Sequence, residues 1–256
     1  MKIAVYGNQC QDHKVEEIRA LFEALRASGA FIEVERGFLE YVKGLIPDVA
    51  ADKAVGDGDV SADVVVSIGG DGTFLRAAAW VGSRETPIFG VNTGHLGYLS
   101  DVSVADVSTF VAGLADGNFR IERRSLLQVD TNAGVALANR YALNEVAILK
   151  NASASMLAMD TAVDTTMLNT YLGDGLIIAT PTGSTAYNLS VGGPILHPAC
   201  SSFVLSPIAA HSLTMRPLVV PDTVEIAVTT RSERSHTFRI SVDGESLSLP
   251  IGSTIR

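Results

Sequence analysis

The 256-residue chain is 47% hydrophobic and carries a net charge of −9, with a pI near 5.0. It is long enough to bury one large core or two modest ones, so we expect a globular protein of one or two domains. The acidic balance and the lack of any run of lysine and arginine argue against a nucleic-acid partner, because such binding relies on clustered positive charge.

The apolar stretch that follows Met1 and Lys2 is too short for a signal peptide or a membrane span. Cys10 and Cys200 form one pair at most, in a chain too large to need a disulfide. We therefore expect a cytoplasmic protein with no membrane partner.

Strand and helix patterns alternate in the first half of the chain. Short runs rich in β-branched residues predict buried strands, and apolar residues at helical spacing predict helices between them. This alternation predicts a largely parallel sheet with right-handed crossovers. The expected elements are strands at 3–6, 31–34, 64–68 and 87–91, a helix over 15–25, a helix from Thr73, and a helix capped by Ser103 and ended by Gly117.

Residues 39–62 lose this periodicity and gather aspartates around glycines, which predicts a mobile acidic loop. Later in the chain, from about residue 119, alternating segments and polar turns take over. Residues 127–131 and 135–143, joined by a turn at 132–134, read as an antiparallel hairpin. The second half is therefore expected to be mostly β, with further strands at 156–163, 176–179, 223–228 and 237–242.

The stretch after the strand at 64–68 is Gly69, Gly70, Asp71, Gly72 and Thr73. Glycines between a strand and a helix let backbone amides approach a ligand closely, and the helix N-terminus favours phosphate. Asp71 would repel a phosphate, so its presence suggests a proton acceptor or a metal contact. The alternative is that Asp71 only caps the following helix.

A second glycine-bearing polar loop, residues 92–97, follows the strand at 87–91 and would emerge at the same sheet edge. It contains His95, a candidate ligand or base that is more often structural when it lacks a partner in sequence.

Three polar clusters interrupt the β-rich half: Asn144–Glu145, Asp174 with its flanking glycines, and the hydroxyl-rich stretch 180–194. Asn144 and Glu145 suit ribose hydroxyls, although a surface glutamate beside a turn asparagine would look the same. The long third cluster suits hydrogen bonding to a polar planar ligand, with Tyr187 as a stacking surface. Such a stretch can also be only a turn.

Several signatures are absent from the sequence. It contains neither a P-loop nor a G-x-G-x-x-G dinucleotide fingerprint. His197 and Cys200 have no second pair to complete a zinc site, and Ser184 lacks the G-x-S-x-G context of a nucleophile.

Taken together, the motifs resemble the bacterial NAD kinase family over nearly the whole chain. The loop 69–73 alone is shared with lipid kinases and phosphofructokinases, and it is the combination with the later motifs that narrows the choice. The motifs that carry the resemblance are Gly69–Thr73, residues 92–97, Asn144–Glu145, Asp174–Gly175 and residues 180–187.

The change of pattern near residue 119 predicts two domains, a Rossmann-like α/β domain over residues 1–118 and an antiparallel, sandwich-like β domain over 119–256. The resemblance implies transfer of the γ-phosphoryl group of ATP to the 2′-hydroxyl of the adenosine ribose of NAD, with Mg²⁺ or another divalent metal accompanying ATP. Asp71 would accept the proton, and Gly69, Gly70, Gly72 and Thr73 would form the phosphate loop. The implied NAD contacts are Asp71, Gly72, Arg76, Asn144, Glu145, Asp174, Thr182, Thr185, Ala186, Tyr187, Asn188, Leu189 and Ser190.

By the same resemblance the protein would be a homodimer or homotetramer, with Asp174 reaching NAD across a subunit contact. Ser155 and Leu172 stand where many relatives carry strongly polar residues, and Asp243–Glu245 match a turn near the family's nucleotide site. Relatives usually continue beyond Ile255–Arg256, so a truncated tail is expected. Two alternatives are a lipid or sugar kinase that shares only the Asp71 loop, and a dinucleotide-binding regulator without catalysis.

Overall fold

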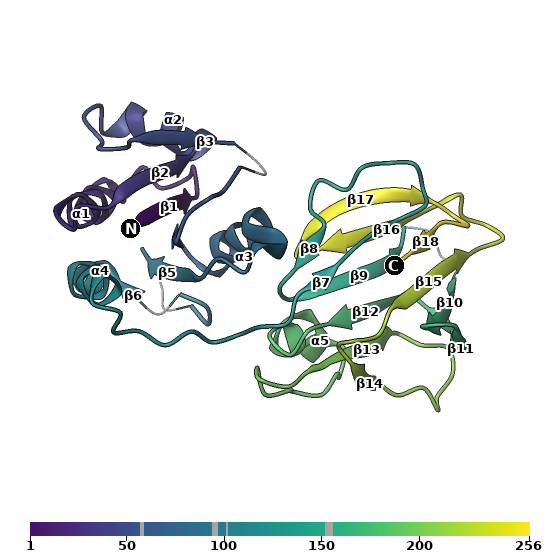
Figure 1. Cartoon of the computed structure of the whole chain (residues 1–256). Coiled ribbons are helices and arrows are strands. Elements are labelled where there is room, and N and C mark those ends of the chain that lie inside the picture. The colour runs from purple at the N-terminus through teal and green to yellow at the C-terminus, as the bar shows by residue number, and fades with distance from the viewer. Residues whose placement is uncertain (57–58, 94–96, 101, 152–155) are drawn as a thin grey trace. The chain divides into compact units, whose positions relative to one another are not determined.

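The computed structural model, shown in Figure 1, describes residues 1–56, 59–93, 97–100, 102–151 and 156–256. The chain divides into two compact units, Met1–Glu122 and Arg123–Arg256, which are described separately below. No helix within these ranges is both long and apolar enough to cross a membrane.

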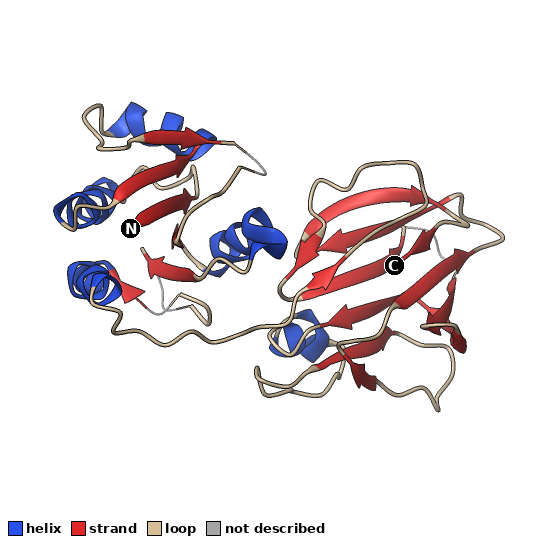
Figure 2. Cartoon of the chain, viewed as in Figure 1, coloured by secondary structure: helices blue, strands red, loops and turns tan. Residues whose placement is uncertain are grey.

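The first unit alternates strands and helices, as Figure 2 shows by colour. Its strands are β1 (Lys2–Gly7), β2 (Phe31–Glu35), β3 (Lys53–Val55), β4 (Val64–Ile68), β5 (Ile88–Asn92) and β6 (Val102–Ser103). Its helices are α1 (Val15–Ala27), α2 (Arg36–Leu45), α3 (Asp71–Val81) and α4 (Val107–Ala115), with 3-10 turns η1 (Gly82–Arg84) and η2 (Val104–Asp106).

The six strands form one parallel sheet in the order β3-β2-β1-β4-β5-β6. Successive side chains of a strand face opposite sides, so Ile3 and Val5 join a core with α1, α2 and α4, whereas Ala4 joins a smaller core with α3. The predicted parallel α/β domain is confirmed. Because the strands are parallel, the loops after β1, β4 and β5 emerge at the same carboxyl edge of the sheet. The strand order reverses between β1 and β4, and ligands bind at such a point in sheets of this kind.

Two local predictions for this unit are wrong. The expected loop over 39–62 contains most of α2, whose Phe38, Leu39 and Val42 are buried, and all of β3. Ser103 does not cap α4; it ends β6, and its hydroxyl donates to the carboxylate of Asp106, which occupies the N-cap position.

The second unit is almost entirely β. Its strands are β7 (Leu127–Gln128), β8 (Tyr141–Ala142), β9 (Glu145–Lys150), β10 (Leu157–Val163), β11 (Thr166–Gly173), β12 (Gly175–Ala179), β13 (Ser202–Ile208), β14 (Leu218–Pro221), β15 (Ile226–Arg231), β16 (Thr237–Val242), β17 (Glu245–Pro250) and β18 (Thr254–Ile255). A 3-10 turn, η3 (Gly183–Thr185), and a short helix, α5 (Tyr187–Ser190), follow β12.

These strands form two antiparallel sheets, β14-β13-β12-β9-β16-β17 and β11-β10-β15-β18, with β7 and β8 as a separate pair. One core draws residues from both larger sheets, among them Ile148 and Phe238 from the first and Met159 and Val228 from the second. The predicted antiparallel, sandwich-like fold is confirmed.

The predicted hairpin over 127–143 is only partly formed, because β7 and β8 pair over two residues each. Residues 135–140 are not a strand, and most of them are exposed. The strand expected at 237–242 is confirmed as β16, and the one expected at 223–228 exists in shifted form as β15, but the two lie in different sheets. The polar turn between them therefore crosses from one layer of the sandwich to the other.

Candidate functional site

The glycine loop after β4 is shaped by close contacts and by backbone conformation. Gly69 has a φ of +149°, and a Cβ there would lie 2.4 Å from Oγ1 of Thr73, so no larger residue fits. A Cβ at Gly70 or Gly72 would meet nothing within 4 Å. The loop is thus closed on the side of Thr73 and open at Gly70 and Gly72, as a surface that receives a ligand must be.

Asp71 is the first residue of α3, and Gly70 is its N-cap, so Asp71 is not the helix cap that the sequence left open as an alternative. Its carboxylate instead receives two backbone amides from the loop after β5. Oδ2 accepts from Tyr98 N at 2.9 Å and Oδ1 from Leu99 N at 3.0 Å. The two predicted polar loops therefore meet at Asp71, although His95 and its neighbours 94 and 96 lie outside the described residues.

Gln11, a buried residue in the loop after β1, belongs to the same edge and was not predicted from the sequence. Its Nε2 donates to Ile68 O at 3.1 Å, and its Oε1 accepts from the Thr93 hydroxyl at 2.9 Å. One amide side chain thus joins the loops after β1, β4 and β5. The only feature of the sequence that could have indicated this role is that Gln11 follows a predicted strand, in the loop that leads to the next helix.

Gly72 and Arg76 are four residues apart on α3, so they lie on the same helix face. Both are exposed. Within the described residues Arg76 makes no hydrogen bond or ion pair, which leaves its guanidinium available for an anionic ligand.

In the second unit, Asn144 and Glu145 lie where β9 begins, beside the end of β12. Asn144 O accepts from Thr180 N at 2.9 Å, and the Thr180 hydroxyl donates to Leu143 O. A Cβ at Gly183 would lie 2.0 Å from Asn144 O, so the two predicted polar clusters pack directly on each other. The structure brings Asn144, Glu145 and the 180–190 stretch together.

The carboxyl group of Glu145 is poorly solvated and close to another carboxylate. Burial is the main cause that raises its pKa to about 7, the charge of Asp243 adds to it, and a backbone hydrogen bond from Tyr187 opposes the rise. Its Oε2 is buried with no hydrogen-bond partner in the described part of the chain. A group in this state is a candidate for binding a ligand that supplies the missing partner.

The stretch after β12 divides into buried and exposed residues. Thr182 is buried, and its Oγ1 accepts from the guanidinium of Arg124 at 3.3 Å. Thr185 and Ala186 are half-buried, whereas Tyr187, Leu189 and Ser190 are exposed. Tyr187 is 40% exposed, which leaves its ring free to stack on a planar ligand.

Asn188 differs from its neighbours because its side chain is fully buried and already hydrogen-bonded. Nδ2 donates to Ser184 O at 3.0 Å and to Pro194 O at 3.1 Å, and Oδ1 accepts from the Ser206 hydroxyl at 2.6 Å. The structure therefore places the Asn188 amide inside the turn, where it fixes the turn to β13.

Asp174 lies away from this group. Its carboxylate pairs with Lys150 at 2.6 Å, and Lys150 ends the strand that Glu145 begins. At about 3.3 Å per residue, the two ends of β9 are roughly 16 Å apart. Leu172, on β11, is exposed, and Ser155 lies outside the described residues.

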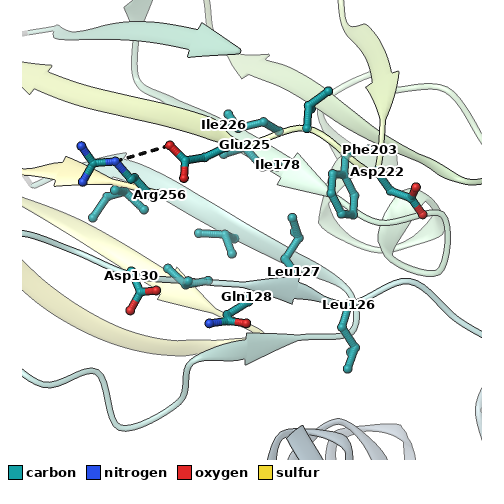
Figure 3. Close-up of a pocket in the computed structure, with 14 residues that line it drawn as sticks. Leu126, Leu127, Gln128, Asp130, Ile178, Phe203, Asp222, Glu225, Ile226 and Arg256 are labelled. Carbon is teal, nitrogen blue, oxygen red and sulfur yellow. Dashed lines mark ion pairs between the residues drawn. The ribbon is translucent and has the colours of Figure 1, made fainter. Parts of the chain in front are cut away.

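A cavity of about 370 Å³ opens between the two sheets of the second unit (Figure 3). Apolar side chains such as Ile178 and Phe203 line it, and an ion pair of Arg256 with Glu225, 3.5 Å long, stands at its edge. None of the residues predicted from the sequence to bind a ligand lines this cavity. Elsewhere in the described ranges, no three histidine, cysteine or carboxylate side chains gather as a metal site would require.

Known families match both units. Residues 49–119 match the ATP-NAD kinase N-terminal domain, and residues 143–255 match the ATP-NAD kinase C-terminal domain. The NAD kinase of Bacteroides fragilis is 45% identical over 247 residues, which are 96% of this chain and 85% of that protein.

Solved structures agree with these matches. An NAD kinase from Archaeoglobus fulgidus, solved in complex with ATP, is 29% identical, with a TM-score of 0.73 over 100% of this chain and 90% of that one. A yeast NADH kinase solved with NADH has a TM-score of 0.87 over 100% of this chain and 77% of its own, but at 22% identity it supports the fold alone. The resemblance seen in the motifs is confirmed, and the chain belongs to the NAD kinase family, whose members phosphorylate NAD.

Proposed function

We propose that the chain transfers the γ-phosphoryl group of ATP to the 2′-hydroxyl of the adenosine ribose of NAD, with Asp71 as the proton acceptor. The bond from the ribose oxygen to the γ-phosphorus forms, the bond from that phosphorus to the β,γ-bridging oxygen breaks, and the hydroxyl proton passes to the Asp71 carboxylate. The products are NADP and ADP. The observation that carries this proposal is a carboxylate at the open end of a glycine loop and at a helix N-terminus.

Phosphoryl transfer needs mainly positioning and charge neutralisation. The open backbone at Gly70 and Gly72 and the exposed guanidinium of Arg76 are suited to holding phosphates or the acceptor dinucleotide. Mg²⁺ or another divalent metal, bound with ATP, would neutralise charge on the transferred group.

We propose that Asn144 and Glu145 hold a ribose of NAD, and that Thr185, Ala186, Tyr187, Leu189 and Ser190 form the wall beside it. Support comes from the Glu145 oxygen, which has no partner among the residues that the structure describes, and from the exposed Tyr187 ring. For Thr182 and Asn188 the contacts argue for a supporting role, since their side chains already bind Arg124, Ser184, Pro194 and Ser206.

Asp174 fits this proposal only through an assembly. Because it lies at the far end of β9 from Glu145, we propose that it contacts the NAD of another subunit in a homodimer or homotetramer. Sedimentation would give the size of the assembly, and an Asp174→Ala variant that kept the wild-type affinity for NAD would refute this contact.

The decisive experiment measures NADP formation from NAD and Mg-ATP by wild type and Asp71→Asn, with NAD binding measured separately by calorimetry. We expect the variant to lose roughly a hundredfold or more in kcat while still binding NAD, the scale of general base catalysis. Asp106→Asn, which alters a carboxylate at the start of α4, is the matched control and should keep the wild-type rate.

Wild-type protein that binds NAD yet forms no NADP from ATP or inorganic polyphosphate would refute the kinase proposal and favour the non-catalytic regulator. Phosphorylation of a lipid or hexose with NAD untouched would favour the other kinase class. If the protein is active with polyphosphate and not with ATP, the proposal still holds for NAD as the acceptor and Asp71 as the base, and only the phosphoryl donor changes.

A further inference from the structure

Two residues hold the backbone of residues 143–145 by hydrogen bonds. One is Thr180, described above, and the other is Asp243, whose carboxylate comes about a hundred residues later in the chain. Asp243 Oδ2 accepts from Leu143 N at 2.7 Å, and its Oδ1 accepts from Asn144 N and Glu145 N, each at 3.0 Å. Three successive amides therefore converge on one side chain, as they do around a bound anion.

All six backbone polar groups of this segment have partners. The three amides donate to the Asp243 carboxylate, Leu143 O accepts from the Thr180 hydroxyl, and Asn144 O accepts from Thr180 N. The sixth group, Glu145 O, accepts from Asp243 N at 3.1 Å. The segment is thus fixed through its own backbone groups, by the side chains and amides of Asp243 and Thr180.

The side chains of the same segment are not used in this way. Asn144 makes no side-chain hydrogen bond within the described residues, and Oε2 of Glu145 is buried without a partner there. A rigid backbone that carries a buried carboxylate oxygen without a partner is the arrangement expected where a ligand completes the hydrogen bonding.

Asp243 itself stands in a tight hairpin turn that fixes its direction. It has a φ of +46° and Gly244 a φ of +89°, in the two-residue connection between β16 and β17. Aspartate and asparagine tolerate this conformation better than most residues. Asp-Gly is the preferred pair in such a two-residue turn, and here the turn aims the carboxylate at residues 143–145.

We propose that Asp243 is a positioning residue for the reaction: it holds the backbone of residues 143–145 so that the side chains of Asn144 and Glu145 meet NAD in one fixed arrangement. This inference rests on the proposed function. It assigns no contact between Asp243 and NAD and no part in the phosphoryl transfer itself.

The test uses Asp243→Asn, which keeps a residue that tolerates the turn but replaces one accepting oxygen by a donor. The KM for NAD should rise roughly ten- to a hundredfold, since one or two hydrogen bonds to a charged group are lost. The KM for ATP should change by less than about threefold, because the site of the perturbation is the NAD-binding segment.

Asp164→Asn is the matched control. Asp164 also has a positive φ, of 53°, in a two-residue connection between β10 and β11, and its Oδ1 accepts the amide of Glu225 at 2.9 Å. Within the described ranges, the structure shows no contact between Asp164 and residues 143–145. The KM of the Asp164→Asn variant for NAD should therefore remain at the wild-type value. Both variants should lose some stability, measured by urea unfolding.

In an Asn144→Ala background, Asp243→Asn should have a smaller effect on the KM for NAD than in wild type, because one of the two side chains that it positions is gone. Should Asp243→Asn fail to fold, Thr180→Val removes the hydroxyl bond to Leu143 O, one of the two contacts by which Thr180 holds the segment, and should raise the KM for NAD in the same selective way. Equal rises in both KM values, full additivity with Asn144→Ala, or behaviour like Asp164→Asn would overturn the inference. Loss of NADP formation by the wild type would instead count against the proposed function.

Discussion

The buried carboxyl group of Glu145 makes a prediction about stability that needs no ligand. Its pKa is raised from the ordinary 4.5 to about 7, chiefly by burial and then by the charge of Asp243. The folded protein therefore binds a proton that the unfolded chain releases between these two values. Stability is highest below about pH 4.5 as far as this group is concerned, and it falls as the pH rises through 7.

The size of the effect follows from the displacement of the pKa. Raising the pKa from 4.5 to about 7 makes the ionised carboxylate cost the folded state about 3 kcal/mol above pH 7. Glu145→Gln keeps the shape and cannot ionise. We expect the variant to be more stable than wild type by up to about 3 kcal/mol at pH 8, and by much less at pH 5.

The measurement is urea unfolding of both proteins without nucleotide, from pH 5 to pH 8. Glu23→Gln, an exposed change on α1, is the control and should track wild type throughout. A difference between Glu145→Gln and wild type that stays constant with pH, or that shrinks as the pH rises, would refute the reasoning, because either result means that Glu145 is not held with a raised pKa.

Two glycine substitutions test the close approaches on which the site depends. Gly183→Ala would place a methyl group 2.0 Å from Asn144 O; it should cost about 1–3 kcal/mol of stability and weaken NAD binding, measured by unfolding and calorimetry. Gly97→Ala would place one 2.2 Å from Oδ1 of Asp71, and it should lower kcat at least about tenfold in steady-state assays, since small displacements of a catalytic group are costly. Gly44→Ala on α2 meets nothing within 4 Å and should leave rate and binding unchanged; unchanged kinetics in the other two variants would mean that the contacts relax without consequence.

Most of the parallel sheet could be predicted from the sequence because its strands are buried on both faces. Val64–Ile68 is fully buried, and a run of β-branched residues is the direct expression of that environment. Helix α2 was missed for the opposite reason. Gly37 and Gly44 weaken the helical pattern, and its N-terminus depends on Glu35, whose carboxylate accepts the amides of Gly37 and Phe38.

The second unit was harder to read in detail. Alternation predicts a strand but does not say which strand pairs with it, so β15 and β16 could not be assigned to different sheets from the sequence. Residues 135–140 alternate weakly and remain exposed, and nothing in their pattern distinguishes a strand from an extended loop.

The same limit applies to the candidate site. Asp71, Asn144 and Glu145 lie in contiguous motifs and could be named from the sequence, although their roles stay predictions. Gln11 joins three loops through contacts with Ile68 and Thr93, which are 57 and 82 residues away. Contacts between residues so far apart in sequence form only when the chain folds, so no local sequence pattern predicts them.

The contacts around Glu145 explain how the chain tolerates an unfavourable group at this position. A buried oxygen without a partner is costly, and a backbone that moved could relieve it by turning the side chain toward water. Thr180 and Asp243 prevent this because they occupy every polar group of the backbone from Leu143 to Glu145. The strain is therefore confined to side chains, where a ribose hydroxyl can remove it by donating to the free oxygen. If Glu145 holds a ribose of NAD as proposed, the free energy that destabilises the empty protein above pH 7 is recovered when NAD binds, and the rigidity of the segment is what links the two.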